Sequence, residues 1–179
     1  MSTSANFNGP GGMKWHAPNS RFLRCIGKVE KCTSPRQLLT YCNDLLIGWS
    51  DKNRCLYAVV ISDEDTDDRC YELTLTHRVP FRVDRLCPSS SGFLLLWGAN
   101  GAAVVTLPHY DALRRARENT PIQCKSWGVG ELLLMQTPGL ELLGLNWLPN
   151  SATEVVMLTN DNCLRLFDVS KKHMNAIIT

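Results

Sequence analysis

The chain has 179 residues, a formal net charge of +2 and a hydrophobic fraction of 44%, which suits one folded domain or part of a larger one. The nearly neutral charge argues against direct nucleic-acid binding, because domains that neutralise phosphates are usually far more basic. No apolar run approaches the roughly 18 residues of a membrane-spanning helix, so we expect no membrane insertion.

The first 20 residues are rich in Ser, Asn, Gly and Pro, which is typical of a flexible arm. Beyond them, short apolar segments alternate with polar turns that contain Gly or Pro, and this pattern predicts about twelve strands. The predicted strands are Arg21–Gly27, Asp44–Trp49, Cys55–Ser62, Cys70–Thr76, Phe81–Leu86, Gly92–Trp97, Ala102–Leu107, Ile122–Trp127, Glu131–Met135, Glu141–Trp147, Glu154–Thr159 and Cys163–Val169. Only Asp111–Asn119 looks helical, and Pro35–Tyr41 is a candidate for a second short helix.

Three segments repeat one pattern, in which two apolar strands flank a tight turn of Asn, Asp or Gly. They are Leu45–Val59, Phe93–Leu107 and Val155–Val169. Asn, Asp and Gly tolerate the positive φ that tight hairpins need. Before the second and third hairpins, another strand ends at a turn that begins with Pro88 or Pro149. This order is typical of a WD-type propeller blade.

The strand count predicts about three four-stranded blades, whereas closed propellers usually have about four to eight. We therefore predict an all-β fold, a partial β-propeller over residues 21–179, with one short helix in an insertion between blades. A sandwich is the alternative arrangement. An incomplete ring would leave open sheet edges unless another chain covers them.

The eight cysteines occur singly, without a C-x-x-C pair, and the chain shows no signal peptide. We therefore expect reduced thiols that serve as small core residues in a cytosolic or nuclear protein. No pair has the spacing of a zinc finger. The cysteines are Cys25, Cys32, Cys42, Cys55, Cys70, Cys87, Cys124 and Cys163.

The charged segments match no catalytic or metal-binding motif. The acidic run Asp63–Asp68 fails as an EF-hand loop, because loop positions six and twelve hold Asp68 and Thr74 instead of Gly and Glu. We interpret it as a solvated loop, or a weak patch for a basic partner. Arg114, Arg115 and Arg117 could meet RNA or an acidic partner, but no aromatic residues are interleaved, so a solvated helix face is favoured.

No residue is predicted to be catalytic, to bind a cofactor or small-molecule substrate, or to ligate a metal. The four histidines are isolated, and nucleophile-elbow, P-loop and dinucleotide motifs are absent from the sequence. The histidines are His16, His77, His109 and His173. Trp49, Trp97 and Trp147 end apolar strands, and we favour burial between blades over a role as exposed anchors.

Two longer stretches carry a specific resemblance. Gly92–Pro108 ends in Leu-Pro and is followed by a polar insertion, and Leu145–Phe167 combines a Trp-x-Pro-x-Ser turn with a Thr-x-Asp-Asn hairpin. In this order and spacing, Leu45–Val169 resembles the N-terminal propeller of the eighty-eight-kilodalton nucleoporin family.

The resemblance implies a structural component on the cytoplasmic side of the nuclear pore complex that supports mRNA and protein transport. It implies docking of the autoproteolytic domain of the ninety-eight-kilodalton nucleoporin through the propeller. It also implies joining to a large cytoplasmic FG-repeat nucleoporin through a coiled coil, but this sequence has no heptad region. Partner-binding residues are not predicted. The alternatives are a generic WD-type adaptor in another complex and, in a different class, an enzyme of the cysteine-hydrolase type.

Overall fold

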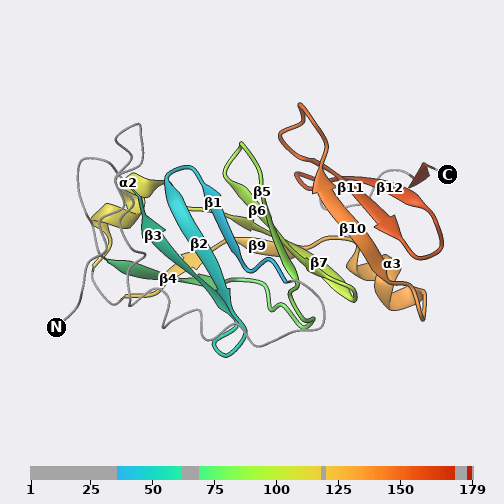
Figure 1. Cartoon of the computed structure of the whole chain (residues 1–179), viewed down its shortest axis with the longest axis horizontal. Helices are drawn as coiled ribbons and strands as arrows, with labels where there is room; N and C mark the ends of the chain where they lie inside the picture. The colour runs from blue at the N-terminus through green and yellow to red at the C-terminus, as the bar shows by residue number, and fades with distance from the viewer. Residues whose placement is uncertain (1–35, 62–68, 118–119, 172–176, 179) are drawn as a thin grey trace, which may run out of the picture.

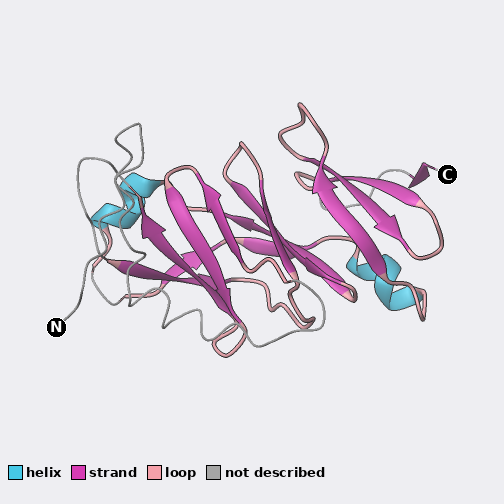
Figure 2. Cartoon of the chain, in the orientation of Figure 1, coloured by secondary structure: helices cyan, strands magenta, loops and turns pink. Residues whose placement is uncertain are grey.

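The computed structural model describes residues 36–61, 69–117, 120–171 and 177–178, without the side chains of Leu132, Leu133, Ile177 and Ile178. Three sheets follow one another along the chain and lie side by side (Figure 1). Strands and loops make up nearly all of the described chain, and its two helices are short (Figure 2). Neither helix is long and apolar enough to cross a membrane. The prediction of an all-β fold with about three propeller-like blades is confirmed.

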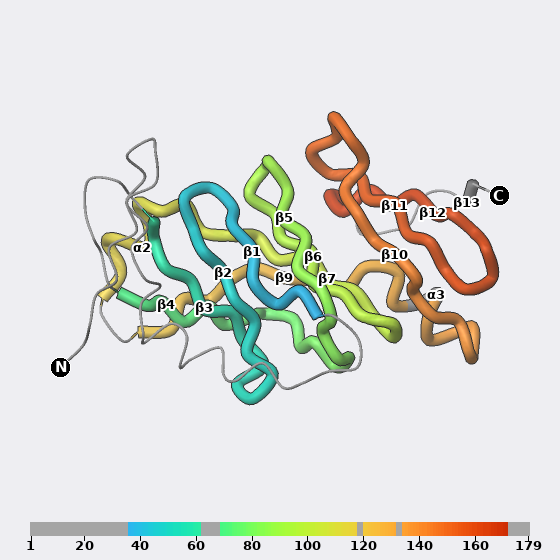
Figure 3. The backbone as a smooth tube through the Cα atoms, viewed as in Figure 1, coloured from blue at the N-terminus to red at the C-terminus, as the bar shows by residue number. Residues whose placement is uncertain are grey.

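The first sheet has five strands, one more than predicted, and is ordered β1-β2-β3-β4-β8. Its strands are β1 (Leu39–Cys42), β2 (Leu45–Ser50), β3 (Cys55–Val60), β4 (Cys70–Leu75) and β8 (Ile122–Cys124). All neighbours are antiparallel except β4 and β8, which are parallel. The added strand comes from the segment after the insertion, which returns to the outer edge of the first sheet (Figure 3).

The second and third sheets have four strands each and are antiparallel throughout. The second contains β5 (Arg85–Pro88), β6 (Phe93–Gly98), β7 (Gly101–Thr106) and β9 (Ser126–Gly128). The third contains β10 (Leu142–Trp147), β11 (Glu154–Thr159), β12 (Leu164–Asp168) and β13 (Ile177–Ile178). Helix α2 (Tyr110–Arg115) lies in the insertion, and α3 (Glu131–Gln136) precedes the third sheet.

The second sheet lies between the first and the third and is buried on both faces. Alternate residues of its strands point to opposite sides and so enter different cores. Leu94 and Leu96 of β6 belong to the core shared with the first sheet, whereas Leu95 belongs to the core shared with the third. All three side chains are 0% exposed. This explains why β6 is apolar throughout, as its sequence predicted.

Two predicted segments change their secondary structure. Glu131–Met135, predicted as a strand, forms helix α3. Its Leu, Met, Glu and Gln residues favour helices, and Gly130 has φ +66°, which turns the chain out of an extended path. The candidate helix Pro35–Tyr41 is also wrong within the described residues, because β1 pairs with β2 there.

Other differences concern the ends of elements. Ile122–Trp127 is divided into β8 and β9, which belong to different sheets. Strand β5 begins at Arg85 instead of Phe81, and the predicted helix Asp111–Asn119 is shortened to α2. The predicted arm of residues 1–20 and the strand Arg21–Gly27 lie outside the described residues.

Candidate functional site

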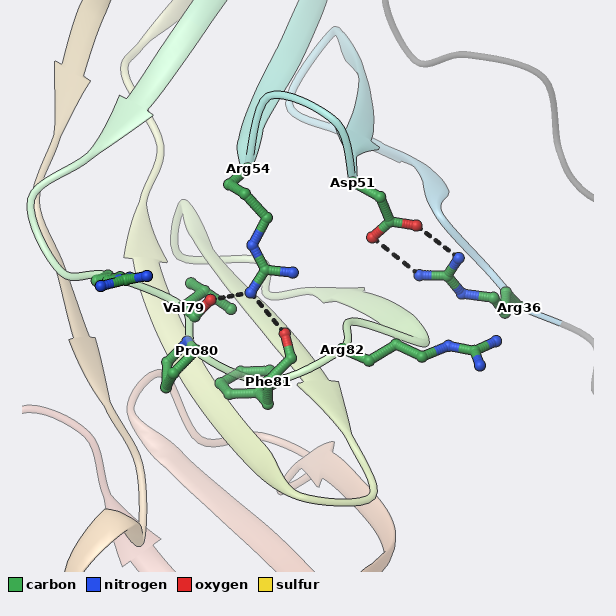
Figure 4. Close-up of a pocket in the computed structure, with 8 residues that line it drawn as sticks. Arg36, Asp51, Arg54, Val79, Pro80, Phe81 and Arg82 are labelled. Atoms are coloured by element: carbon green, nitrogen blue, oxygen red, sulfur yellow. Dashed lines mark hydrogen bonds and ion pairs between the residues drawn. The ribbon is translucent and has the colours of Figure 1, made fainter.

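A cleft of about 690 Å³ lies beside the β2–β3 turn (Figure 4). Its other side is formed by residues 76–84, the connector, which lead from β4 to β5 of the second sheet. Four arginines and one aspartate supply its charged groups, and the connector supplies an apolar surface. The lining residues are Arg36, Asp51, Arg54, Arg78, Val79, Pro80, Phe81 and Arg82. The volume lies in the range of ligand pockets, which is about 300–1,000 Å³.

Arg54 fixes the connector to the turn. Its Nη2 donates hydrogen bonds to the carbonyl oxygens of Val79 and Phe81, the latter at 2.7 Å. The guanidinium also lies over the ring of Trp49, at 5.6 Å from the ring centroid. Arg54 has φ +54°, a left-handed conformation that costs a non-glycine residue about 1–2 kcal/mol. The turn thus places a long cationic side chain where glycine or asparagine would be less strained.

Arg36 forms the second anchor. Its Nη1 and Nη2 donate to the two carboxylate oxygens of Asp51, at 2.6 and 3.1 Å, in a bidentate pair. Its Nε donates to the carbonyl oxygen of Val83 at 3.1 Å and lies 3.3 Å from Oδ1 of Asp84. The Arg36 side chain is only 12% exposed. Arg36 therefore ties the start of the first sheet to both the turn and the connector.

These contacts explain why residues 81–84 do not form the predicted strand. A strand uses its carbonyl groups in the ladder of a neighbouring strand. Here the carbonyls of Phe81 and Val83 accept hydrogen bonds from arginine side chains. The buried groups are satisfied without a sheet.

The electrostatics keep Asp51 ionised. Burial acts to raise the pKa of its carboxyl group, but hydrogen bonds from Arg36 and Trp49 lower it, and so do the charges of Arg36 and Arg54. The net result is a pKa below the ordinary value of 3.8. Asp51 therefore remains bound to Arg36 as a carboxylate, while Arg54 binds the connector and Arg82 lies beside Asp84.

The side chains of the cleft are suited to anion recognition. Guanidinium groups bind carboxylates and phosphates through paired N–H donors. The lining contains no Ser, Cys or His that could act as nucleophile or base. No group of metal-ligating side chains occurs in the described part of the chain.

The tryptophans singled out from the sequence differ in burial. Trp49 is 0% exposed, and its Nε1 donates to Oδ1 of Asp51 at 2.9 Å. Trp97 and Trp147 are half-buried against the core between the second and third sheets. Trp147 stacks on Phe93 with ring centroids 6.1 Å apart. All three thus pack between sheets, as the sequence analysis favoured.

No disulfide joins the cysteines of the described residues, in agreement with the expectation of reduced thiols. Burial raises the pKa of the Cys124 thiol to about 11, and it also raises the pKa values of Cys42 and Cys87. These groups stay protonated near neutral pH and are poor nucleophiles. Cys25 and Cys32 lie outside the described residues.

The remaining sequence candidates do not gather into a site. Nε2 of His77 lies 2.8 Å from Oε1 of Glu131, whereas His109 caps helix α2. Arg115, the last residue of α2, and Arg117 are exposed, and Arg114 lies over the ring of Tyr110 in the same helix. His16, His173 and the acidic run Asp63–Asp68 lie outside the described residues.

Sequence reasoning missed the arginine cleft. Its members come from the segment before β1, the β2–β3 turn and the segment Arg78–Arg82. The segment Arg-Val-Pro-Phe-Arg places two arginines around a proline, and an arginine ends the turn at Arg54. These were the available signals, but they are separated in sequence, and only the fold brings them together.

One of the comparisons with known proteins identifies a family. A family model for Nup88, described as a nuclear pore component, matches residues 20–178. No curated protein matches the chain.

Among solved structures, the chain resembles one chain in the crystal structure of the Chaetomium thermophilum heterotrimeric Nup82 NTD–Nup159 TAIL–Nup145N APD complex, with a TM-score of 0.64 and 15% identity. The alignment covers 88% of this chain but only 30% of that one. A second structure, of YCF48 bound to D1 peptide, has a TM-score of 0.43 and 13% identity and is covered to 42%, against 86% of this chain. At such identities the first likeness shows the fold alone.

Proposed function

The chain belongs to the Nup88 family of nuclear pore components, and from this premise we propose that it acts as a protein-docking scaffold on the cytoplasmic side of the pore. In that role it supports mRNA and protein transport by holding other nucleoporins in place. The observation that carries the proposal is the family match, which extends over residues 20–178. This range agrees with a single partial propeller over residues 21–179, which we propose as the domain.

The chemistry of the described residues supports a non-enzymatic role. The arginine cleft has no Ser, Cys or His in its lining, and its one carboxylate, Asp51, is paired with Arg36. The buried thiols have raised pKa values. A docking role needs rigid surfaces and no reactive group, so we propose that the chain is not an enzyme.

The proposed partners are other nucleoporins. The similar crystal structure is of a complex named for three of them, Nup82, Nup159 and Nup145N. We propose that this chain docks the autoproteolytic domain of a ninety-eight-kilodalton-class nucleoporin. The large cytoplasmic FG-repeat nucleoporin is the second proposed partner, as the sequence resemblance implied.

Localisation and binding test the proposal. The fluorescently tagged chain is expressed in cells, and the tag alone serves as the control. We expect a nuclear rim, and we expect the purified chain to retain the autoproteolytic domain in a pull-down. A diffuse cytosolic signal together with failure to retain that domain would contradict the docking role and favour a generic propeller adaptor.

A further inference from the structure

We propose that the arginine cleft binds an acidic, extended peptide segment of a partner protein, with side-chain carboxylates paired to Arg54, Arg78 and Arg82. This inference rests on the proposed docking function and specifies one surface that performs it. It assigns a ligand class to a site that the sequence did not predict.

The charge of the cleft departs from that of the whole molecule. The lining holds four guanidinium groups and one carboxylate, whereas the chain as a whole has a formal net charge of only +2. The single carboxylate, Asp51, is taken by Arg36 in a bidentate pair. Asp84, beside the cleft, lies against both Arg36 and Arg82. The four guanidinium groups still outnumber these two carboxylates, so an anionic partner complements the cleft.

Arg54, Arg78 and Arg82 each keep capacity for a ligand. Arg54 uses its Nη2 for two carbonyl oxygens, and a guanidinium has five N–H donors. Carbonyl oxygens satisfy donors but do not neutralise the charge. Arg78 is exposed. Arg82 is 60% exposed and lies 3.1 Å from Oδ1 of Asp84 through Nε, and an ion pair this exposed is weak enough for a ligand carboxylate to compete with it.

The framework holds part of the site in place before binding. Arg54 is fixed to the connector by hydrogen bonds to Val79 and Phe81 (Figure 4). Arg36 is fixed to it by a hydrogen bond to Val83. Recognition by groups that are already ordered loses less side-chain entropy. The strained φ of Arg54 fits this role, because strain at a turn is often retained where the side chain has a function.

The shape and lining favour a peptide over a nucleic acid. Single-stranded nucleic acids bind where aromatic rings are available for stacking. The aromatic residues at the cleft are buried, with Phe81 7% and Trp49 0% exposed. Exposed Pro80 leaves a small apolar surface beside the arginines, which suits the aliphatic part of a glutamate side chain.

Fluorescence anisotropy tests the proposal with defined probes and the full 179-residue chain. The probe is a fluorescein-labelled dodecapeptide of alternating Glu and Ser, and the control probe carries Gln in place of Glu. We expect saturable binding of the Glu peptide, at least tenfold weaker binding of the Gln peptide, and a marked loss of affinity on raising the salt from about 50 to 300 mM, since exposed charges are screened.

Matched variants locate the binding. Arg78→Glu/Arg82→Glu reverses two charges in the cleft, and we expect it to weaken the Glu peptide at least tenfold. Arg115→Glu/Arg117→Glu makes the same charge change at α2, which lies at the opposite end of the first sheet from the β2–β3 turn (Figure 1). We expect this second pair to change the affinity for the Glu peptide less than threefold. The affinity of Arg78→Gln/Arg82→Gln for the Glu peptide should lie between those of wild type and Arg78→Glu/Arg82→Glu. Thermal melts that match wild type verify that each variant is folded.

Three results would overturn the inference. They are no saturable binding of the Glu peptide, equal weakening by the two charge-reversal pairs, and tighter binding of a labelled twelve-nucleotide oligo(dT) that depends on Arg78 and Arg82. The outcome is separable from the docking role. If the Glu peptide does not bind but the tagged chain still labels the nuclear rim, only the proposal of an acidic ligand is contradicted. If the peptide binds but the tagged chain gives no rim signal, only the proposed pore function is contradicted.

Discussion

Replacement of Arg54 in the β2–β3 turn separates two effects on stability, the hydrogen bonds of its side chain and the strain of its backbone. Arg54→Ala removes the hydrogen bonds to the carbonyls of Val79 and Phe81, whose residues are 4% and 7% exposed. It keeps a non-glycine residue at φ +54°. Arg54→Gly removes the same hydrogen bonds but relieves the backbone strain.

The magnitudes follow from these contacts. Leaving a buried carbonyl without its donor costs about 1–3 kcal/mol, and water reaches this open cleft, so we expect Arg54→Ala to lose about 2–3 kcal/mol in total. Glycine at a left-handed position recovers about 1 kcal/mol. For a protein of this size, 1 kcal/mol changes Tm by about 2–4 °C, so the alanine variant should melt about 5–10 °C lower and the glycine variant should lie between it and wild type.

Urea and thermal denaturation followed by circular dichroism measure the series. Arg115→Ala, at an exposed position of α2, is the matched control, with an expected change in the free energy of unfolding within about 0.5 kcal/mol. Equal losses for Arg54→Ala and Arg115→Ala would refute the anchoring of the connector. A glycine variant less stable than the alanine variant would refute the strain.

Three other substitutions test the packing and the charge of the fold. Leu95 lies in the core between the second and third sheets and is 0% exposed, so Leu95→Ala should lower the free energy of unfolding by about 2–5 kcal/mol. Leu143 is 56% exposed, and Leu143→Ala should change the free energy of unfolding by less than about 0.5 kcal/mol. Equal urea midpoints for the two variants would contradict the burial of Leu95. Gly101→Ala would place its Cβ 2.1 Å from a phenylalanine ring, so we expect a lower thermal midpoint, and an unchanged one would show that the ring moves freely. Because the folded-state pKa of Asp51 is lowered from 3.8, its stabilisation is complete above that pH and is lost as the pH falls toward the folded value; the difference in urea midpoint between wild type and Asp51→Asn should therefore shrink in acid, and a difference that grows would contradict the ion pair with Arg36.

The hairpins were predictable because their signals are local. The turn before β12 was expected to need positive φ, and Asn162 has φ +62°. The apolar strand β6 was expected to be buried on both faces, and Leu94, Leu95 and Leu96 are all 0% exposed. Alternation and turn chemistry act over a few residues, so the sequence reports them directly.

The predictions were wrong where contacts between residues far apart in the sequence determine the local structure. Arg36 lies 47 positions before Val83, whose carbonyl it binds, and no pattern within residues 81–86 shows that this carbonyl is taken. In the same way, the segment Ile122–Trp127 reads as one strand, but its two halves pair with β4 and β7 of different sheets. Helix α3 was missed because a short apolar run fits both a strand and a helix.

The arginine cleft was missed for the same reason. Its charged residues belong to three separate segments, and each arginine alone reads as an ordinary surface residue. Their proximity depends on the position of the connector between the first and second sheets. A site of this kind becomes visible only when the tertiary contacts are known.

Proximity labelling tests the central claim most directly. The full chain is fused to a biotin ligase and expressed in cells, with the ligase alone as control, and the biotinylated proteins are identified by mass spectrometry. A docking component of the nuclear pore predicts that nucleoporins, with those of the cytoplasmic side foremost, are the most enriched proteins. Enrichment of an unrelated complex without nucleoporins would contradict the account.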